Sequence, residues 1–267
     1  PTPTPTPPPT PTPTAAPPVA GFDTCTAPSL ATMSAWHSDY GAVGAYIGGA
    51  NSACASGNLS AGWIRSVSSS GWGVLPIYVG PQAPCWGGTG ALVDPAKAAA
   101  QGKAAGLDAL SDAQTLGLAV GSPIYYDMEG YKGDSSCKNA VIAFLGAWDL
   151  QVTAAGYVSA VYSSQNSGIV DMQAAVAGKT PGFTPPDAIW IALWDGVSSL
   201  SDGTLAWPLA ARSKQYAGNV SATVGGITLS IDKDLVGGPM AGLAPRSAGP
   251  ADNSERANRF ASTAVGS

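Results

Sequence analysis

The sequence contains very little histidine and little charge. His37 is the single histidine in 267 residues. One imidazole cannot supply an H-E-x-x-H zinc site, or any other metal site built on several histidines. Charged residues make up only 11% of the chain, 12 basic against 17 acidic, for a formal net charge of −5. The chain therefore lacks the cationic surface that binding to nucleic acid or anionic lipid requires.

Long apolar runs and several enzyme motifs are also missing. No uninterrupted run of about 18 apolar residues occurs, so no membrane span is expected. No G-x-S-x-G occurs, which excludes a nucleophile-elbow serine partnered by His37. No G-x-G-x-x-G follows the first strand-like run, which disfavours a dinucleotide-binding fold. The function classes that remain are catalysis by carboxyl groups and ligand binding without catalysis.

The two ends differ in composition from the rest of the chain. Residues 1–19 are rich in proline and threonine, which predicts an extended linker. No charged or apolar leader precedes Pro1, so we expect that a signal peptide has been removed. Residues 238–267 are small and polar without a sustained period, which predicts a disordered tail. Residues 20–237 would then form one domain.

The four cysteines are even in number and show no C-x-x-C spacing. They are Cys25, Cys54, Cys85 and Cys137. Zinc bound by four such scattered thiolates is disfavoured, and two disulfides in an exported protein are the better interpretation. Three pairings are possible. If each cysteine follows a successive barrel strand, neighbouring loops favour Cys25–Cys54 and Cys85–Cys137.

Short β-rich runs recur about eight times between residues 19 and 236. They are residues 19–24, 42–49, 73–80, 122–131, 156–164, 188–196, 213–218 and 226–236. Helical patterns separate the early runs, whereas after Ser164 only residues 170–178 are clearly helical. Strands that alternate with helices indicate parallel βαβ units. We therefore predict an α/β fold, a single closed parallel (β/α)8 TIM barrel with short or irregular late helices.

Acidic residues gather where the predicted strands end, at Asp23, Asp127, Glu129, Asp195, Asp232 and Asp234. The carboxyl ends of barrel strands carry the active site in this fold. Asp127 and Glu129 lie two residues apart, so their side chains share one face of a strand. Two close carboxyls have different pKa values, and glycoside hydrolysis needs such an acid–base pair. The alternative, that this D-x-E only caps a strand, is disfavoured by the acids on the other strands.

Aromatic and amide side chains in the same runs are candidates for binding a sugar. Pyranose rings stack on aromatic faces, although aromatics are also simply common in strands. The candidates for substrate binding are Tyr46, Tyr78, Tyr126, Tyr162, Trp194, Asp195, Gln215 and Tyr216.

Several sequence blocks in this order resemble a bacterial glycoside-hydrolase-like family found in exported actinobacterial proteins. They are GFDTCTAPSLATMSAW, YIGG, PIYVGPQAPC, PIYYDMEGY, GYVSAVYSS, IWIALWD and KQYAG, over about residues 20–236. That family is similar to the family-25 lysozymes (N-acetylmuramidases). The resemblance implies that Glu129 is the general acid and that Asp127 orients the acetamido group of the substrate or a water. It also implies that Asp23 and Asp232 complete the acidic floor.

Two functions from different classes fit these observations. The first is a secreted or cell-wall-associated hydrolase that cleaves a cell-wall or extracellular polysaccharide by carboxylate acid–base catalysis. It would act as a monomer, without a cofactor or a metal ion. The second is a non-catalytic carbohydrate-binding module on a degenerate hydrolase barrel. They differ at Glu129, because general acid catalysis requires an ionisable group there and binding does not. We favour the enzyme.

Overall fold

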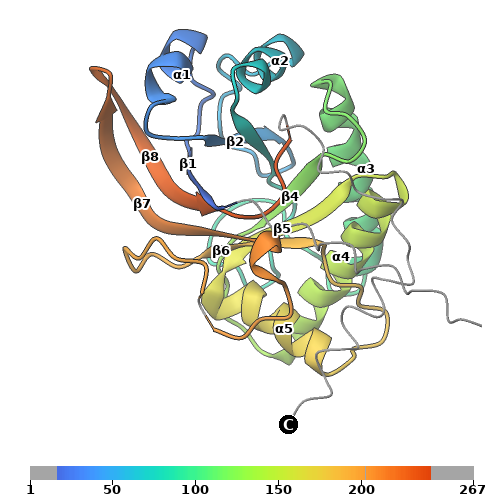
Figure 1. Ribbon diagram of the computed structural model, residues 1–267. Helices are drawn as coiled ribbons and strands as arrows, with labels where there is room; N and C mark the ends of the chain where they lie inside the picture. The colour runs from blue at the N-terminus through green and yellow to red at the C-terminus, as the bar shows by residue number, and fades with distance from the viewer. Residues whose placement is uncertain (1–16, 202, 242–267) are drawn as a thin grey trace, which may run out of the picture.

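The computed structural model describes residues 17–201 and 203–241. In this part of the chain, eight strands close into a barrel in sequence order (Figure 1). The strands are β1 (Val19–Asp23), β2 (Ala42–Gly48), β3 (Gly73–Tyr78), β4 (Pro123–Met128), β5 (Val158–Ser164), β6 (Ala188–Ala192), β7 (Arg212–Val224) and β8 (Ile227–Val236). The predicted α/β barrel is confirmed, with each strand close to its expected run.

The two longest helices lie in the middle of the chain, and the helices before and after them are short. The helices are α1 (Leu30–Trp36), α2 (Ala61–Ser69), α3 (Ala98–Thr115), α4 (Ser135–Ala154), and a π-helical turn (Gln165–Ile169) that leads into α5 (Val170–Ala177). Ser29, Ser60 and Asp134 cap α1, α2 and α4 by accepting a backbone N–H with the side chain. After β6, the helical structure of the described residues is limited to one three-residue 3-10 turn, Leu209–Ala211. The weak helical periodicity of that region predicts this scarcity of helix.

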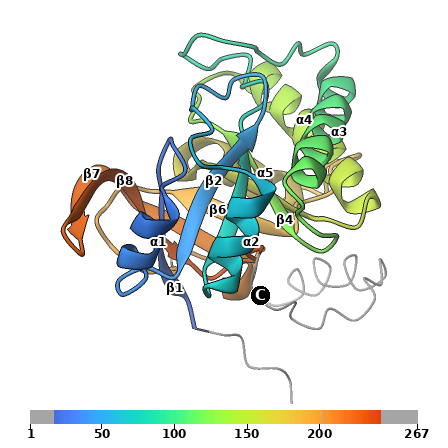
Figure 2. The same cartoon turned by 90° about the horizontal axis from the view of Figure 1, so that it is seen from above.

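The direction of β8 differs from the parallel barrel that the sequence predicted. β8 runs antiparallel to both β7 and β1. The cause is the turn Gly225–Gly226, where both residues have positive φ, +56° and +78°. Two such residues form the tight turn that suits an antiparallel hairpin, and glycine adopts it without a steric penalty. The β7–β8 hairpin therefore projects beyond the barrel, opposite α3 and α4 (Figures 1 and 2).

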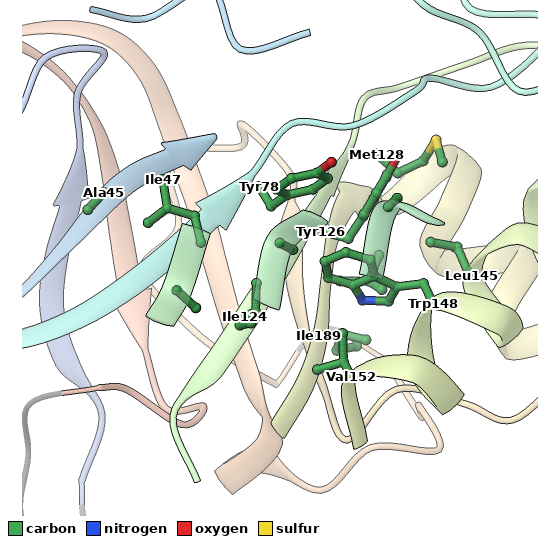
Figure 3. Packing of buried hydrophobic residues seen from close by; sticks show 14 of the residues in the cluster. Ala45, Ile47, Tyr78, Ile124, Tyr126, Met128, Leu145, Trp148, Val152 and Ile189 are labelled. Carbon is green, nitrogen blue, oxygen red and sulfur yellow. The ribbon is translucent and has the colours of Figure 1, made fainter. Parts of the chain in front are cut away.

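Alternation along the strands divides the barrel into two faces. One set of side chains fills the interior: Ala42, Leu75, Ile77, Tyr125, Ala160, Ala188, Trp190 and Val236. The other set packs against the helices, where Tyr78 and Tyr126 of the sheet lie against Trp148 of α4 (Figure 3). This layer buries several aromatic rings, and the hydrophobic effect on that area is the main force that holds helices to sheet.

The described residues after β8 close the end of the barrel at which β3 begins. The backbone of Ala241 pairs with Val74, and the hydroxyl of Tyr125 donates to the carbonyl of Pro239 at 2.8 Å. Most of the expected linker (1–19) and tail (238–267) lies outside the described residues. Among those described, no helix is both long and apolar enough to span a bilayer.

All four cysteines form disulfides in the pairing that neighbouring loops favoured. Cys25–Cys54 joins the loops after β1 and β2, and Cys85–Cys137 joins the loop after β3 to the first turn of α4. Both bridges therefore lie at the carboxyl ends of the strands, where the acidic residues gather.

Removal of the Cys85–Cys137 bridge is expected to destabilise the protein strongly. The bridge closes a loop with a sequence separation of 52. Loop-closure entropy predicts that Cys85→Ala together with Cys137→Ala lowers the free energy of unfolding by about 4 kcal/mol. Equilibrium denaturation in guanidinium chloride measures this change. A loss below about 1 kcal/mol would show that the bridge constrains the unfolded chain little.

Candidate active site

Five carboxyl groups face the barrel interior near one end. Asp23 is the last residue of β1, and Asp232 lies opposite it on β8. Asp234 follows two residues later on the same face of β8. Asp127 belongs to β4, and Glu129 comes one residue after that strand ends. Because β8 runs antiparallel to β1, the first half of β8 lies beside the carboxyl end of β1. Asp232 is therefore paired with Asp23.

Asp23 is buried and receives two hydrogen bonds. Tyr46 donates its hydroxyl to Oδ1 at 2.8 Å, and Gln215 donates Nε2 to Oδ2 at 2.8 Å. The side-chain oxygen Oε1 of Gln215 in turn accepts from the hydroxyl of Tyr162 at 2.9 Å and from Nε1 of Trp194 at 2.8 Å. Four of the predicted substrate-binding residues are thus brought together around Asp23.

Burial and mutual repulsion raise the pKa values of these acids. Burial raises the pKa of Asp23 to about 7, with a further contribution from the charge of Asp232, although the bonds from Tyr46 and Gln215 oppose the shift. Burial also raises the pKa of Asp127 well above its usual range, reinforced by the charges of Glu129 and Asp23. Protonated carboxyls are therefore held in this cluster under conditions where exposed ones would be ionised.

Glu129 is partly buried and carries a raised pKa. Burial is the main cause, and the charge of Asp232 adds to it, while a hydrogen bond from the N–H of Gly130 opposes it. Asp232 itself is half-buried, and its Oδ1 accepts the N–H of Asn219 at 2.6 Å. Glu129 is thus an acid that can carry a proton at a site with nearby carboxylates.

Asp234 joins this cluster although the predicted catalytic set did not include it. Its side chain is 1% exposed, and Oδ1 accepts from Nε1 of Trp190 at 3.1 Å. Burial and the charge of Asp23 raise its pKa well above the usual range. Among the described residues, Oδ2 of Asp234 and Oδ1 of Asp127 have no hydrogen-bond partner. Two buried carboxyl oxygens of the cluster therefore lack a partner within the described part of the chain.

Two predicted binding residues lie outside the cluster. Tyr78 and Tyr126 point toward the helices, where Tyr78 donates to Asp108 of α3 at 2.7 Å and Tyr126 donates to the carbonyl of Pro81 at 2.6 Å (Figure 3). The alternation that turns Asp127 into the barrel turns Tyr126 out of it. We therefore do not retain these two tyrosines as substrate-binding candidates.

Asp195 and Tyr216 lie at the edge of the site. Asp195 accepts from Nζ of Lys214 at 2.9 Å, and this hydrogen bond lowers its pKa. The Lys214 side chain is fully buried on the outward face of β7, so Asp195 is drawn away from the acid cluster. Tyr216 is partly buried, and its pKa is raised by burial and then by the charge of Asp234.

The chemistry available here is proton transfer from a carboxyl group to a bound molecule. No three His, Cys, Asp or Glu side chains in the described ranges are arranged to hold a metal ion. The cluster combines buried acids with raised pKa values, aromatic donors and unpartnered acceptor oxygens. Such an arrangement can protonate an oxygen atom of a bound ligand and stabilise positive charge beside it.

A known protein family matches most of the chain. The model of the Rv2525c-like, glycoside hydrolase-like domain matches residues 34–236, in agreement with the family that the sequence blocks resemble. No curated protein matches the chain.

Solved structures share the fold at low sequence identity. The Tat-secreted protein Rv2525c of Mycobacterium tuberculosis, in complex with L-tartrate, aligns with a TM-score of 0.57 at 17% identity, over 81% of this chain and 94% of that one. An uncharacterised B. stearothermophilus protein gives 0.55 at 18%, over 81% and 95%. The spore cortex lytic enzyme SleM of Clostridium perfringens gives 0.54 at 12%, over 82% and 67%.

Proposed function

Because the chain belongs to the family of Rv2525c-like, glycoside hydrolase-like domains, we propose that it is a secreted enzyme that cleaves a glycosidic bond in a cell-wall or extracellular polysaccharide. The observation that carries the proposal is the pair Asp127 and Glu129, which share one face of β4 among further buried acids. The fold shared with a spore cortex lytic enzyme supports a glycan of the cell envelope as the substrate.

In this proposal Glu129 donates its proton to the glycosidic oxygen as the bond breaks, and water supplies the oxygen that completes the hydrolysis at the anomeric carbon. Its raised pKa keeps the proton available, and general acids work best when their pKa lies near the working pH. Asp127 orients the acetamido group of the sugar, or a water, through its unpartnered Oδ1. Asp23 and Asp232 supply negative potential for the positive charge that develops on the sugar ring in the transition state.

Trp194 is the proposed stacking surface for a sugar ring. Its side chain is 56% exposed, although its Nε1 is fixed by Gln215. The indole lies against the backbone of β7, because a Cβ at Gly218 would collide with the ring. One ring face is therefore covered by the sheet. The exposed remainder of the ring, connected through Gln215 to Asp23, is suited to the apolar face of a pyranose.

Trp194→Ala is expected to weaken glycan binding more than it slows the chemistry. Aromatic contacts of this kind contribute about 1 kcal/mol, so KM should rise about fivefold or more while kcat changes little. Trp194→Phe keeps a ring and should lose less. Steady-state kinetics on the two variants separates the effects. An unchanged KM in Trp194→Ala would remove the stacking role.

We further propose that the barrel acts outside the cell, between a linker and a tail; the predicted bounds of the barrel, residues 20–237, widen to include Val19 of β1 and residues 238–241, which pack against the barrel. Two disulfides suit an oxidising compartment, and Rv2525c, which shares the fold, is Tat-secreted. An extracellular location is expected both for the hydrolase and for the binding module.

Product analysis separates the hydrolase from the binding module. The protein is incubated with peptidoglycan, arabinogalactan or chitin oligosaccharides, and new reducing ends are counted. We expect release from at least one of these glycans. If one of them binds but none is cleaved, the non-catalytic carbohydrate-binding module is the correct function.

A further inference from the structure

On the edge of β4 that faces β3, the end next to Glu129 is held by a side chain, whereas the other edge pairs with β5 as far as Met128. β3 pairs with β4 only as far as Tyr78 beside Tyr126. Beyond that point Gln82 donates Nε2 to the carbonyl of Asp127 at 2.8 Å and accepts the N–H of Glu129 with Oε1 at 2.8 Å. A parallel neighbouring strand would donate to and accept from these same two backbone groups. The amide of Gln82 therefore replaces one rung of the sheet.

The orientation of this amide is fixed by its surroundings. Gln82 is 0% exposed, and Nε2 donates a second hydrogen bond to the carbonyl of Gly80 at 3.1 Å. Its own backbone is held by the carbonyl of Ala91 at 2.9 Å and the N–H of Val93 at 2.8 Å. Both N–H groups and the oxygen of the side-chain amide are thus satisfied, which is what a buried amide requires.

We propose that Gln82 is a positioning residue, which fixes the backbone of Glu129 so that its carboxyl stays on the same face as Asp127. The inference rests on the proposed hydrolase function. Glu129 lies one residue past the end of β4, where Gln82 supplies the partner for its backbone N–H. Misplacement of a reacting group by about 1 Å can cost a factor of 10² in rate, so this single rung matters.

Asn51, in the loop between β2 and α2, provides a control that contacts the loop carrying Gln82. Its Nδ2 donates to the carbonyls of Gly80 at 3.0 Å and Ala91 at 2.8 Å, and its Oδ1 accepts the N–H of Ala91 at 2.7 Å. Its hydrogen bonds therefore brace the loop that carries Gln82 without reaching the backbone of β4. Asn51→Ala should weaken the loop while leaving both bonds from Gln82 to β4 in place.

The experiment compares Gln82→Met with Asn51→Ala by amide hydrogen exchange and by steady-state kinetics on the cleaved glycan. Met matches Gln in length and removes both the donor and the acceptor. In Gln82→Met we expect the Glu129 amide to exchange about tenfold faster or more, and kcat to fall about 10- to 100-fold with KM nearly unchanged. In Asn51→Ala the Glu129 amide and kcat should stay as in the wild type.

The outcomes separate this inference from the proposed function. Unchanged exchange at Glu129 in Gln82→Met would overturn the inference, as would an equal loss of kcat in both variants. Faster exchange with an unchanged kcat would overturn the positioning role and leave the hydrolase intact. Should the wild type cleave no glycan, the hydrolase fails together with the catalytic part of the inference, while exchange still decides whether Gln82 holds Glu129.

A second variant covers the case in which Gln82→Met does not fold. Gln82→Glu has the same shape and keeps an acceptor for the N–H of Glu129. The Glu129 amide should then remain protected from exchange as in the wild type. Loss of that protection in a folded Gln82→Glu protein would contradict the assignment of this hydrogen bond.

Discussion

Glu129→Gln is expected to lower the rate of glycan hydrolysis by about 10²- to 10⁴-fold, the contribution usual for a positioned general acid. The amide keeps the size and the hydrogen-bonding capacity of the side chain but has no proton to transfer. The measurement is kcat from the release of reducing ends, with the dissociation constant of the glycan measured by calorimetry on the same preparation.

Glycan affinity serves as the control for this variant. Binding should stay within about threefold of the wild type, because the lost interaction belongs to the transition state. A variant that hydrolyses its glycan as fast as the wild type would show that another group is the acid. A parallel loss of affinity and rate would instead indicate that Glu129 binds the substrate.

Asp127→Asn is expected to lower kcat by about 10²- to 10³-fold, the scale found when one preorganised electrostatic contact to a transition state is removed. The amide replaces the carboxyl that orients the acetamido group of the sugar or a water, so this contact is lost in the transition state. The same substitution should raise the free energy of unfolding. Asp127 is a buried carboxyl whose Oδ1 has no partner among the described residues, so replacing it by an uncharged group relieves a desolvation cost. Kinetics and thermal unfolding of the same variant test both statements.

Asp108→Asn is the matched control for Asp127→Asn. Asp108 lies on α3, outside the barrel, and accepts the hydroxyl of Tyr78. The same change of carboxylate to amide at this position should leave kcat within about twofold. If Asp127→Asn unfolds at a lower temperature than the wild type while retaining its activity, the D-x-E only caps a strand.

Much of the fold could be predicted from local patterns. Strand-like runs alternate with helical ones that end in glycine, and Gly117 and Gly156 have the positive φ expected just past a helix. The direction of β8 was also within reach, because Gly225–Gly226 between two β-rich runs signals a hairpin. The prediction of a fully parallel barrel extends the βαβ pattern of the early runs to the last strands, where little helix separates them.

The site was less predictable because its parts come from distant positions. Asp127 and Glu129 could be paired by their spacing of two residues. The same alternation places Tyr126 on the opposite face of β4, so Tyr126 was a poor choice as a substrate-binding residue. Gln82 had no such signal. It reaches Asp127 and Glu129 across 45 and 47 residues from a loop without any period, so only the folded chain shows the contact.

Titration of the Glu129 carboxyl measures whether burial and the charge of Asp232 raise its pKa. The chain contains only two glutamates, Glu129 and Glu255, so selective ¹³C labelling of glutamate gives two carboxyl signals. Glu129→Gln assigns them. We expect the Glu129 carboxyl to titrate above the ordinary value of 4.5. A Glu129 pKa at or below that value would contradict this expectation.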